Sequence, residues 1–98
     1  MLRVLEIVAS SPYYLYCKFN NGVIKKLDVK PIIEHHMHLN GVVDLLNETV
    51  FKTVKIGEFG EIVWVDIVKT VQDGKEIKWD YDISPEFAYQ NSTSVVAS

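Results

Sequence analysis

The sequence has little cysteine and no long uncharged apolar run. Cys17 is the single cysteine, so a disulfide bond within the chain is excluded. Charged residues interrupt every apolar stretch well short of the roughly 20 residues that a membrane-spanning helix needs. Arg3 and Glu6 fall where a signal peptide would be apolar, and no cleavage pattern follows them. We therefore expect a cytoplasmic protein that has no membrane partner.

Basic residues are also too few for a nucleic-acid-binding surface. Lys and Arg number 10 against 13 Asp and Glu, which gives a net charge of −3. Binding to phosphates needs an excess of Lys and Arg on at least one face. The densest basic group, Lys25 and Lys26 with Lys30, is interrupted by Asp28. This balance argues against nucleic acid as a partner.

Apolar material for a core is plentiful, since 48% of the 98 residues are hydrophobic and 11% are aromatic. A chain of this length forms one domain and buries enough surface to fold without a metal or a disulfide. We expect a single α+β domain over residues 1–90. The small and polar residues 91–98 are expected to form a flexible tail.

The N-terminal third predicts antiparallel strands. Residues 2–9 are short, apolar and β-branched, and they stop at a Ser-Ser-Pro turn. Residues 13–19 alternate, which places Leu15, Cys17 and Phe19 on one buried face. The Asn-Gly pair that follows is typical of a hairpin turn, and residues 23–27 form the returning strand.

Three sites carry the start signals of short helices. Asp28 offers a cap before Pro31, which favours a helix through about His36. Asn47 is a candidate N-cap for a second helix. A third is expected from Ser84-Pro85-Glu86 to about Gln90, with a hydroxyl cap, proline in the first turn and an acidic residue beside it.

The region between the second and third helices predicts another hairpin, because residues 61–71 and 75–81 flank an Asp-Gly turn. Strict alternation would place Ile67 and Trp64 on opposite faces. The predicted fold is a small, mainly antiparallel sheet built from two β-hairpins with two or three short helices. The second hairpin carries more apolar side chain than a solvated arm should expose, so we expect a protein interface there. Its predicted residues are Val65, Ile67, Val68, Val71, Ile77, Trp79 and Tyr81.

The order of these elements resembles an uncharacterised bacterial family, the domain of unknown function 2442. The similarity covers about residues 2–90 and depends on the order and spacing of several short motifs. These are Tyr13-Tyr14-Leu15, Phe19, Asn21-Gly22, Asp28, Pro31, Gly41, Leu46, Phe51, Val54-Lys55-Ile56, Trp64, the ending Asp82-Ile83-Ser84-Pro85-Glu86, and Tyr89.

The resemblance implies a small antiparallel sheet with short helices and no established enzymatic activity. It also implies a context in which some members are fused to a helix-turn-helix DNA-binding domain and others pair with a small protein in toxin–antitoxin-like systems. This chain has no room for the DNA-binding domain. It departs from the family where residues 65–81 separate Trp64 from the Asp-Ile-Ser-Pro ending; alternatively Trp79 is the matching tryptophan and the insertion precedes it.

The histidines are clustered. If Glu34 to His38 is helical, His35 and His38 share one face, and imidazoles on adjacent turns can bind zinc or nickel. A metal site formed by His35, His36 and His38 needs further ligands, and no other Cys or His besides Cys17 is present. The alternative is a polar, partly exposed junction.

No other group of residues indicates catalysis. Cys17 shares its strand face with core residues, which favours a buried, unreactive thiol. Asp66, Asp80, Asp82 and Glu86 show no sign of the cleft that an acid–base pair requires. We therefore expect a non-enzymatic interaction module without a cofactor, self-associating or paired with a small bacterial protein. The alternative is a metal- or small-molecule-binding protein that uses the histidines.

Overall fold

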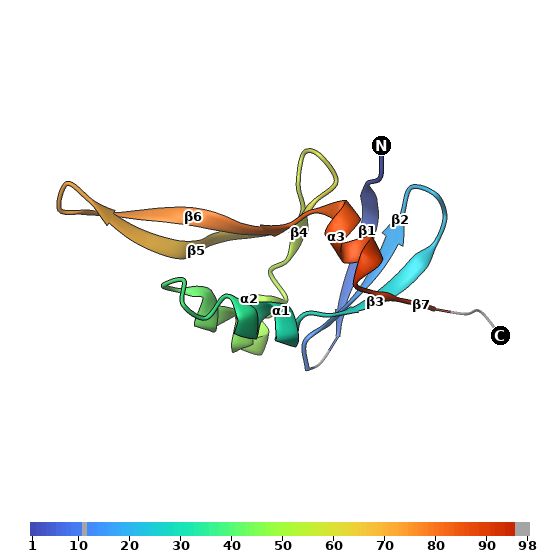
Figure 1. The fold of residues 1–98 in the computed structure, drawn as a ribbon, viewed down its shortest axis with the longest axis horizontal. Helices are drawn as coiled ribbons and strands as arrows, with labels where there is room; N and C mark the ends of the chain where they lie inside the picture. Colours follow the sequence, from blue (N-terminus) through green and yellow to red (C-terminus); the bar gives the residue numbers. More distant parts are fainter. Residues whose placement is uncertain (11, 96–98) are drawn as a thin grey trace.

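The structure is a computed structural model that describes residues 1–10 and 12–95. It contains two antiparallel sheets and short helices (Figure 1). The first sheet has the order β1 (Val4–Ser10), β2 (Tyr14–Phe19), β3 (Ile24–Asp28) and β7 (Thr93–Ser94). The second has the order β4 (Lys55–Ile56), β5 (Ile62–Gln72) and β6 (Lys75–Ile83). The helices are α1 (Lys30–His35), the 3-10 helix η1 (Val42–Leu46), α2 (Glu48–Phe51) and α3 (Pro85–Gln90).

This arrangement confirms the predicted α+β class and both hairpins. The hairpins belong to separate sheets, however, because β3 pairs with β7 on its far side while β5 pairs with β4 and β6. Part of the predicted tail is therefore placed: Thr93 and Ser94 pair with Lys26 and Lys25. Residues 96–98 of that tail lie outside the described residues.

Local sequence explains the strands and helices. Leu15, Cys17 and Phe19 are buried as their alternation predicts. The side chains of Asn47 and Ser84 accept hydrogen bonds from the backbone N–H groups of Thr49 and Phe87, so both predicted caps are confirmed. Asp28 accepts from the backbone of Lys30, although the N-cap position of α1 is Val29.

Trp64 is the largest fully buried side chain and lies where the second sheet packs on the helices. Its indole N–H donates to the carbonyl oxygen of Phe51 at 2.8 Å, which satisfies the one polar atom of the ring. The Phe51 and Trp64 rings are 5.7 Å apart, and Tyr81 lies 6.1 Å from Trp64 on the neighbouring strand. This aromatic group holds one half of the β5–β6 hairpin in the core.

Gly41 allows the segment before η1 to approach β5. Its φ is 98°, and a Cβ at this position would lie 2.1 Å from the carbonyl oxygen of Ile67. The adjacent carbonyl of Asn40 accepts a hydrogen bond from the backbone N–H of Lys69. Only glycine fits both the positive φ and the close approach. The contact fixes the point at which β5 leaves the core.

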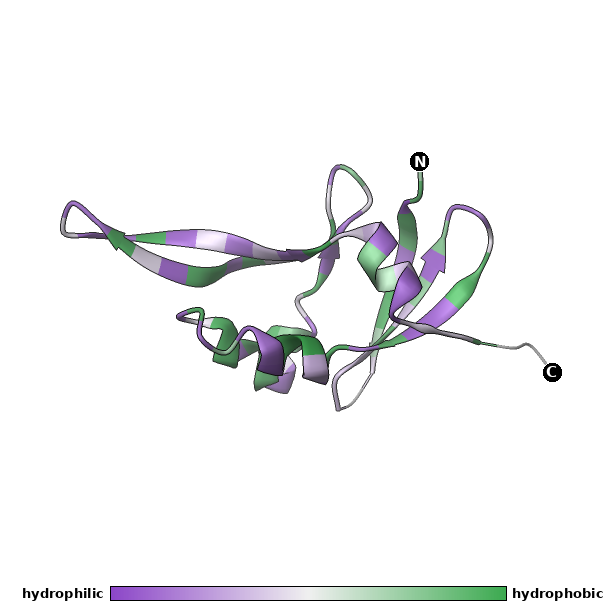
Figure 2. Cartoon of the chain, viewed as in Figure 1, coloured by the Kyte–Doolittle hydropathy of each residue, from purple (hydrophilic) through white to green (hydrophobic). Residues whose placement is uncertain are grey.

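Beyond that point the β5–β6 hairpin projects from the body, and we call residues 68–79 the arm (Figure 1). The molecule measures 54 × 28 × 20 Å and has a radius of gyration of 14.0 Å. A compact domain of this length has a radius of gyration of about 13 Å. Polar and apolar residues alternate along the arm in Figure 2. The arm is therefore an ordered hairpin that extends beyond the helices.

Candidate functional site

A β-bulge in β5 interrupts the predicted alternation at residues 65–67. Trp64 pairs with Tyr81 and Val68 pairs with Trp79, so three residues of β5 lie opposite one residue of β6. Asp66, inside the bulge, has a φ of 57°, and its backbone N–H donates to the carboxylate of Asp80 at 3.1 Å. Ile67 was predicted as an interface residue, but it lies within the bulge and is buried, as Trp64 is. On either side of the bulge the alternation holds, because Trp64 and Val68 pair with Tyr81 and Trp79, which share one face of β6.

The predicted interface residues differ in burial. Ile67 and Tyr81 are each only 6% exposed and belong to the core, so their assignment to a surface is corrected. Trp79 is 49% exposed and Val71 is 73% exposed, and Val65 is exposed as well. Val68 and Ile77 are partly buried.

Trp79 is held in place although it is exposed. Its indole N–H donates to the Thr70 hydroxyl at 2.8 Å, across the strands of the arm. Ile77 lies opposite Thr70, and Val68 lies opposite Trp79, so these four side chains share one face. Val71, opposite Glu76, lies on the other face. The arm thus presents an ordered aromatic and apolar surface.

The base of the arm is fixed to η1. The ammonium group of Lys69 lies 4.0 Å from the carboxylate of Asp44, in addition to the backbone bond from Lys69 to Asn40. In the described chain, the hydrogen bonds of residues 70–78 are confined to the hairpin itself. Beyond Lys69 the arm therefore has no hydrogen bond to the rest of the described chain.

The histidines lie at the end of α1, but the structure does not gather them into one set of ligands. His35 ends the helix, and His35 and His38 are exposed. His36 instead turns toward β6, where its Nδ1 atom is 2.6 Å from the Tyr81 hydroxyl. Within residues 1–10 and 12–95, no three His, Cys, Asp or Glu side chains are grouped so that they could hold a metal ion.

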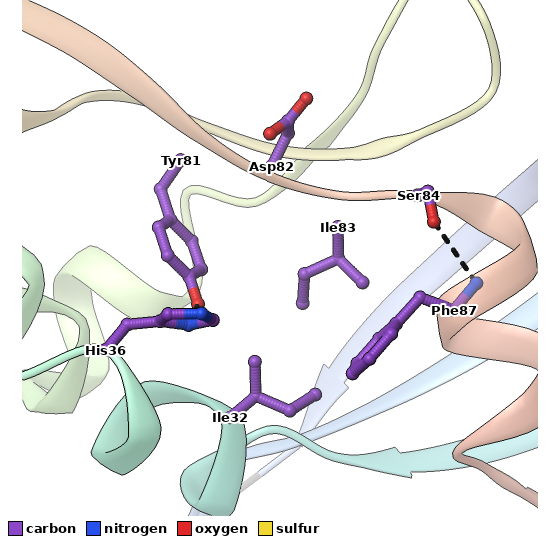
Figure 3. Close-up of a pocket in the computed structure, with 7 residues that line it drawn as sticks. All are labelled: Ile32, His36, Tyr81, Asp82, Ile83, Ser84 and Phe87. Atoms are coloured by element: carbon purple, nitrogen blue, oxygen red, sulfur yellow. Dashed lines mark hydrogen bonds between the residues drawn. The ribbon is translucent and has the colours of Figure 1, made fainter.

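A shallow groove lies beside His36, between α1 and the start of α3 (Figure 3). One part has a volume of about 300 Å³, and an adjoining part of about 460 Å³ shares Ile32, His36 and Phe87. The Tyr81 ring reaches from β6 to His36, while Ile83 and Phe87 lie across from it (Figure 3). Its walls are mainly apolar, with a histidine and a phenol at one side.

Burial raises the pKa of Tyr81 to about 12, and the nearby carboxylate of Asp82 adds to the effect. The phenol therefore keeps its proton at neutral pH and can donate it to His36. The short contact fixes the histidine ring against β6. In this arrangement Tyr81 is a positioning and packing residue rather than a base.

Cys17 is buried in the first sheet, and burial raises the pKa of its thiol to about 12. The thiolate is the reactive form of cysteine, and it is suppressed at this site. Cys17 also lies on the strand face of Leu15 and Phe19, which are core residues. The predicted buried position is confirmed.

Comparisons with known proteins do not assign this chain to a family. No family model, curated protein or solved structure matches the chain. The resemblance to the domain of unknown function 2442 stays a prediction. Among the described residues, no helix is both long and apolar enough to cross a bilayer.

Sequence reasoning missed the contact between His36 and Tyr81. The two residues are 45 positions apart, and their meeting depends on how α1 packs on the second sheet. The one signal in the sequence was the alignment of Tyr81 with Trp79 and Ile77 on one strand face. That signal indicated an apolar face but gave no information on which part of it the helices cover.

Proposed function

We propose that this chain is a non-enzymatic protein-interaction module that binds another protein chain through the arm. The observation that carries the proposal is the half-exposed Trp79, held by Thr70 on an ordered hairpin that projects from the core. Tryptophan is among the residues that contribute most to protein interfaces, and a preordered aromatic side chain loses little conformational entropy on binding.

The arm has features that favour a protein over a small molecule as its partner. It is a convex hairpin, whereas small molecules are bound in concave pockets. Exposed apolar side chains occur on both of its faces, with Trp79 on one and Val71 on the other. β6 is the outer strand of its sheet, and outer strands can pair with a strand of another chain.

The test is a comparison of arm and core variants in self-association and in capture of purified candidate partners. We expect Trp79→Ala to weaken binding by at least about tenfold, which corresponds to the loss of a central aromatic anchor. Phe59→Ala is a matched control, because Phe59 is an exposed aromatic residue outside the arm. Equal binding by wild type, W79A and F59A would contradict the proposal.

The groove beside His36 favours a second candidate function, the binding of a small apolar molecule. Apolar walls formed by Ile32, Ile83 and Phe87, with the polar pair His36 and Tyr81 at one side, are the usual composition of such sites. A screen of small aromatic fragments by amide chemical shifts tests it. Shifts should be lost in His36→Ala and retained in His38→Ala, since His38 does not line the groove. Identical shifts in both variants would contradict this function.

A further inference from the structure

We propose that the partner of the arm is a second copy of this chain, bound edge to edge through β6 in an antiparallel register centred on Ile77. This inference rests on the proposed function of the arm as a binding surface. It adds the identity of the partner, the strand edge that is used and the residues that face one another.

The outer edge of β6 has backbone groups that can pair with another strand. Lys69 lies opposite Lys78, and the backbone N–H of Lys69 donates outward to Asn40 rather than to β6. Opposed residues in an antiparallel pair alternate between exchanging hydrogen bonds and pointing away from each other. The backbone N–H and C=O of Lys78 therefore point away from β5, and those of Glu76, two residues earlier, do so as well.

Two identical antiparallel strands in one sheet are related by a two-fold axis perpendicular to the sheet. The axis passes through a pair formed by one residue and its own copy, and residues equally far before and after this centre face each other. When Ile77 is the centre, Glu76 faces Lys78 of the second copy, and Lys75 faces Trp79. The first pairing joins opposite charges twice, and the second places an ammonium group beside an indole ring.

The hydrogen-bond pattern agrees with this centre. Glu76 and Lys78, whose backbone groups point outward, form the two hydrogen-bonded pairs of the interface. Ile77, whose backbone groups face β5, lies at the non-hydrogen-bonded pair on the axis, where side chains approach most closely. The two Ile77 side chains then contact each other on the face that also carries Trp79.

Neighbouring registers place like charges together. A centre on Glu76 or on Lys78 brings that residue against its own copy. A centre on Trp79 places Glu76 opposite Asp82. Like charges directly opposite each other destabilise a strand pair. The register centred on Ile77 avoids these repulsions.

The shape of the molecule accommodates this pairing. The overlap covers residues 75–79 of β6, which lie opposite residues 68–72 of β5. An antiparallel overlap of the arms directs the two cores to opposite ends of the dimer. Five paired residues span about 17 Å and bury little surface, so we expect a weak dimer whose population depends on concentration.

A charge swap tests the register. Glu76→Lys and Lys78→Glu each convert both attractive pairs into repulsive ones, and each should weaken dimerisation by roughly tenfold or more in sedimentation experiments. The double variant E76K/K78E restores opposite charges and keeps the net charge at −3, so it should recover the wild-type dissociation constant. Lys52→Glu changes the charge by the same amount as K78E, away from the arm, and should leave dimerisation unchanged.

A cysteine at the axis gives an independent test. In the proposed dimer, Ile77→Cys places two thiols at a non-hydrogen-bonded pair, where Cα atoms lie within disulfide range. Oxidation should link most I77C chains into dimers. Val71→Cys is the control, because Val71 is more exposed but lies three strand spacings and two residues along the strand, roughly 16 Å, from its own copy. Cys17 is buried and should not contribute.

The outcomes distinguish this inference from the proposed function. Recovery of dimerisation by the swap together with selective linkage of I77C supports the register. A dimer that is weakened by W79A, but neither restored by the swap nor linked through I77C, overturns the register and leaves the arm as the binding surface. A chain that stays monomeric from about 1 µM to about 1 mM overturns the second copy as the partner.

Discussion

The two ends of the β5–β6 hairpin contain one tryptophan each, and the two residues have opposite surroundings. Trp64 is 0% exposed and donates to the backbone of α2, whereas Trp79 is 49% exposed and donates to Thr70 within the hairpin. The core end thus joins the sheet to the helices, and beyond Lys69 the hydrogen bonds of the described arm stay within the hairpin. One hairpin therefore combines a half that is buried in the core with a half that exposes apolar side chains.

The largest expected effect on stability is that of Trp64→Ala, and Trp79→Ala is its comparison. Trp64→Ala removes the largest buried side chain and leaves the Phe51 carbonyl with the longer bond from the backbone N–H of Val54, so we expect a loss of about 3–5 kcal/mol in the free energy of unfolding. Trp79→Ala should cost about 1 kcal/mol or less, because half of the ring is already in water. Urea unfolding followed by circular dichroism measures both. Equal losses would break the distinction between core and arm.

Two glycines give a similar comparison of backbone positions. Gly41→Ala introduces a Cβ against the Ile67 carbonyl at a φ of 98°, so we expect a loss of at least about 2 kcal/mol. Gly74, at the arm tip, also has a positive φ, but a Cβ there would meet nothing within 4 Å, so Gly74→Ala should cost about 1 kcal/mol. Denaturation midpoints of the two variants test this order. A larger loss for G74A would show that the contact between Asn40–Gly41 and β5 does not hold the arm.

Removal of the Tyr81 hydroxyl tests the junction between the halves. Tyr81→Phe deletes the bond to His36, and the expected cost is about 1 kcal/mol. The pKa of Tyr81 is raised from 10.0 to about 12 in the fold. The folded state therefore holds this proton more tightly, and the associated stability is complete below about pH 10 and declines as the pH rises toward 12.

The measurement is the pH dependence of unfolding in wild type and Y81F, together with tyrosinate absorbance. Wild type should lose more stability between pH 10 and 12 than Y81F does. Cys17 adds the same trend from its own raised pKa in both proteins, so the difference between them isolates Tyr81. Parallel curves for the two proteins would contradict the buried phenol.

The last prediction concerns the reactivity of Cys17, which is buried in the first sheet. A thiol reagent at mildly alkaline pH should modify Cys17 far more slowly in the folded chain than in urea, since burial raises the pKa of the thiol to about 12. A cysteine placed at Val71, which is exposed on the arm, should react at the rate of an unfolded thiol. Rapid modification of native Cys17 would contradict the packing of the first sheet.

Local signals were sufficient for much of the fold. The alternation around Cys17, the Asn-Gly and Asp-Gly turns, and the caps at Asn47 and Ser84 act over a few residues, so they could be predicted. The assignment of the hairpins to separate sheets depends on contacts between distant segments. For example, Thr93 pairs with Lys26 although the two residues are far apart in the sequence, and no local pattern indicates this pairing.

The exposure of the second hairpin was predictable only in part. Its apolar excess led to the prediction of an interface, which stays a prediction, whereas Ile67, inside the bulge, and Tyr81 are buried. Strict alternation is a good guide only where strands pair without extra residues. The contact between His36 and Tyr81 could not be predicted from the sequence either, because it depends on the packing of α1 against β6.

Amide hydrogen exchange at Glu76 and Lys78, measured over a range of protein concentrations, tests the central claim most directly. We expect both amides to exchange rapidly in dilute solution and to become protected as concentration rises, while Ile77, bonded within the hairpin, changes less. Protection should be absent in K78E and return in E76K/K78E. Rapid exchange of Glu76 and Lys78 at every concentration would contradict the pairing of two chains through β6.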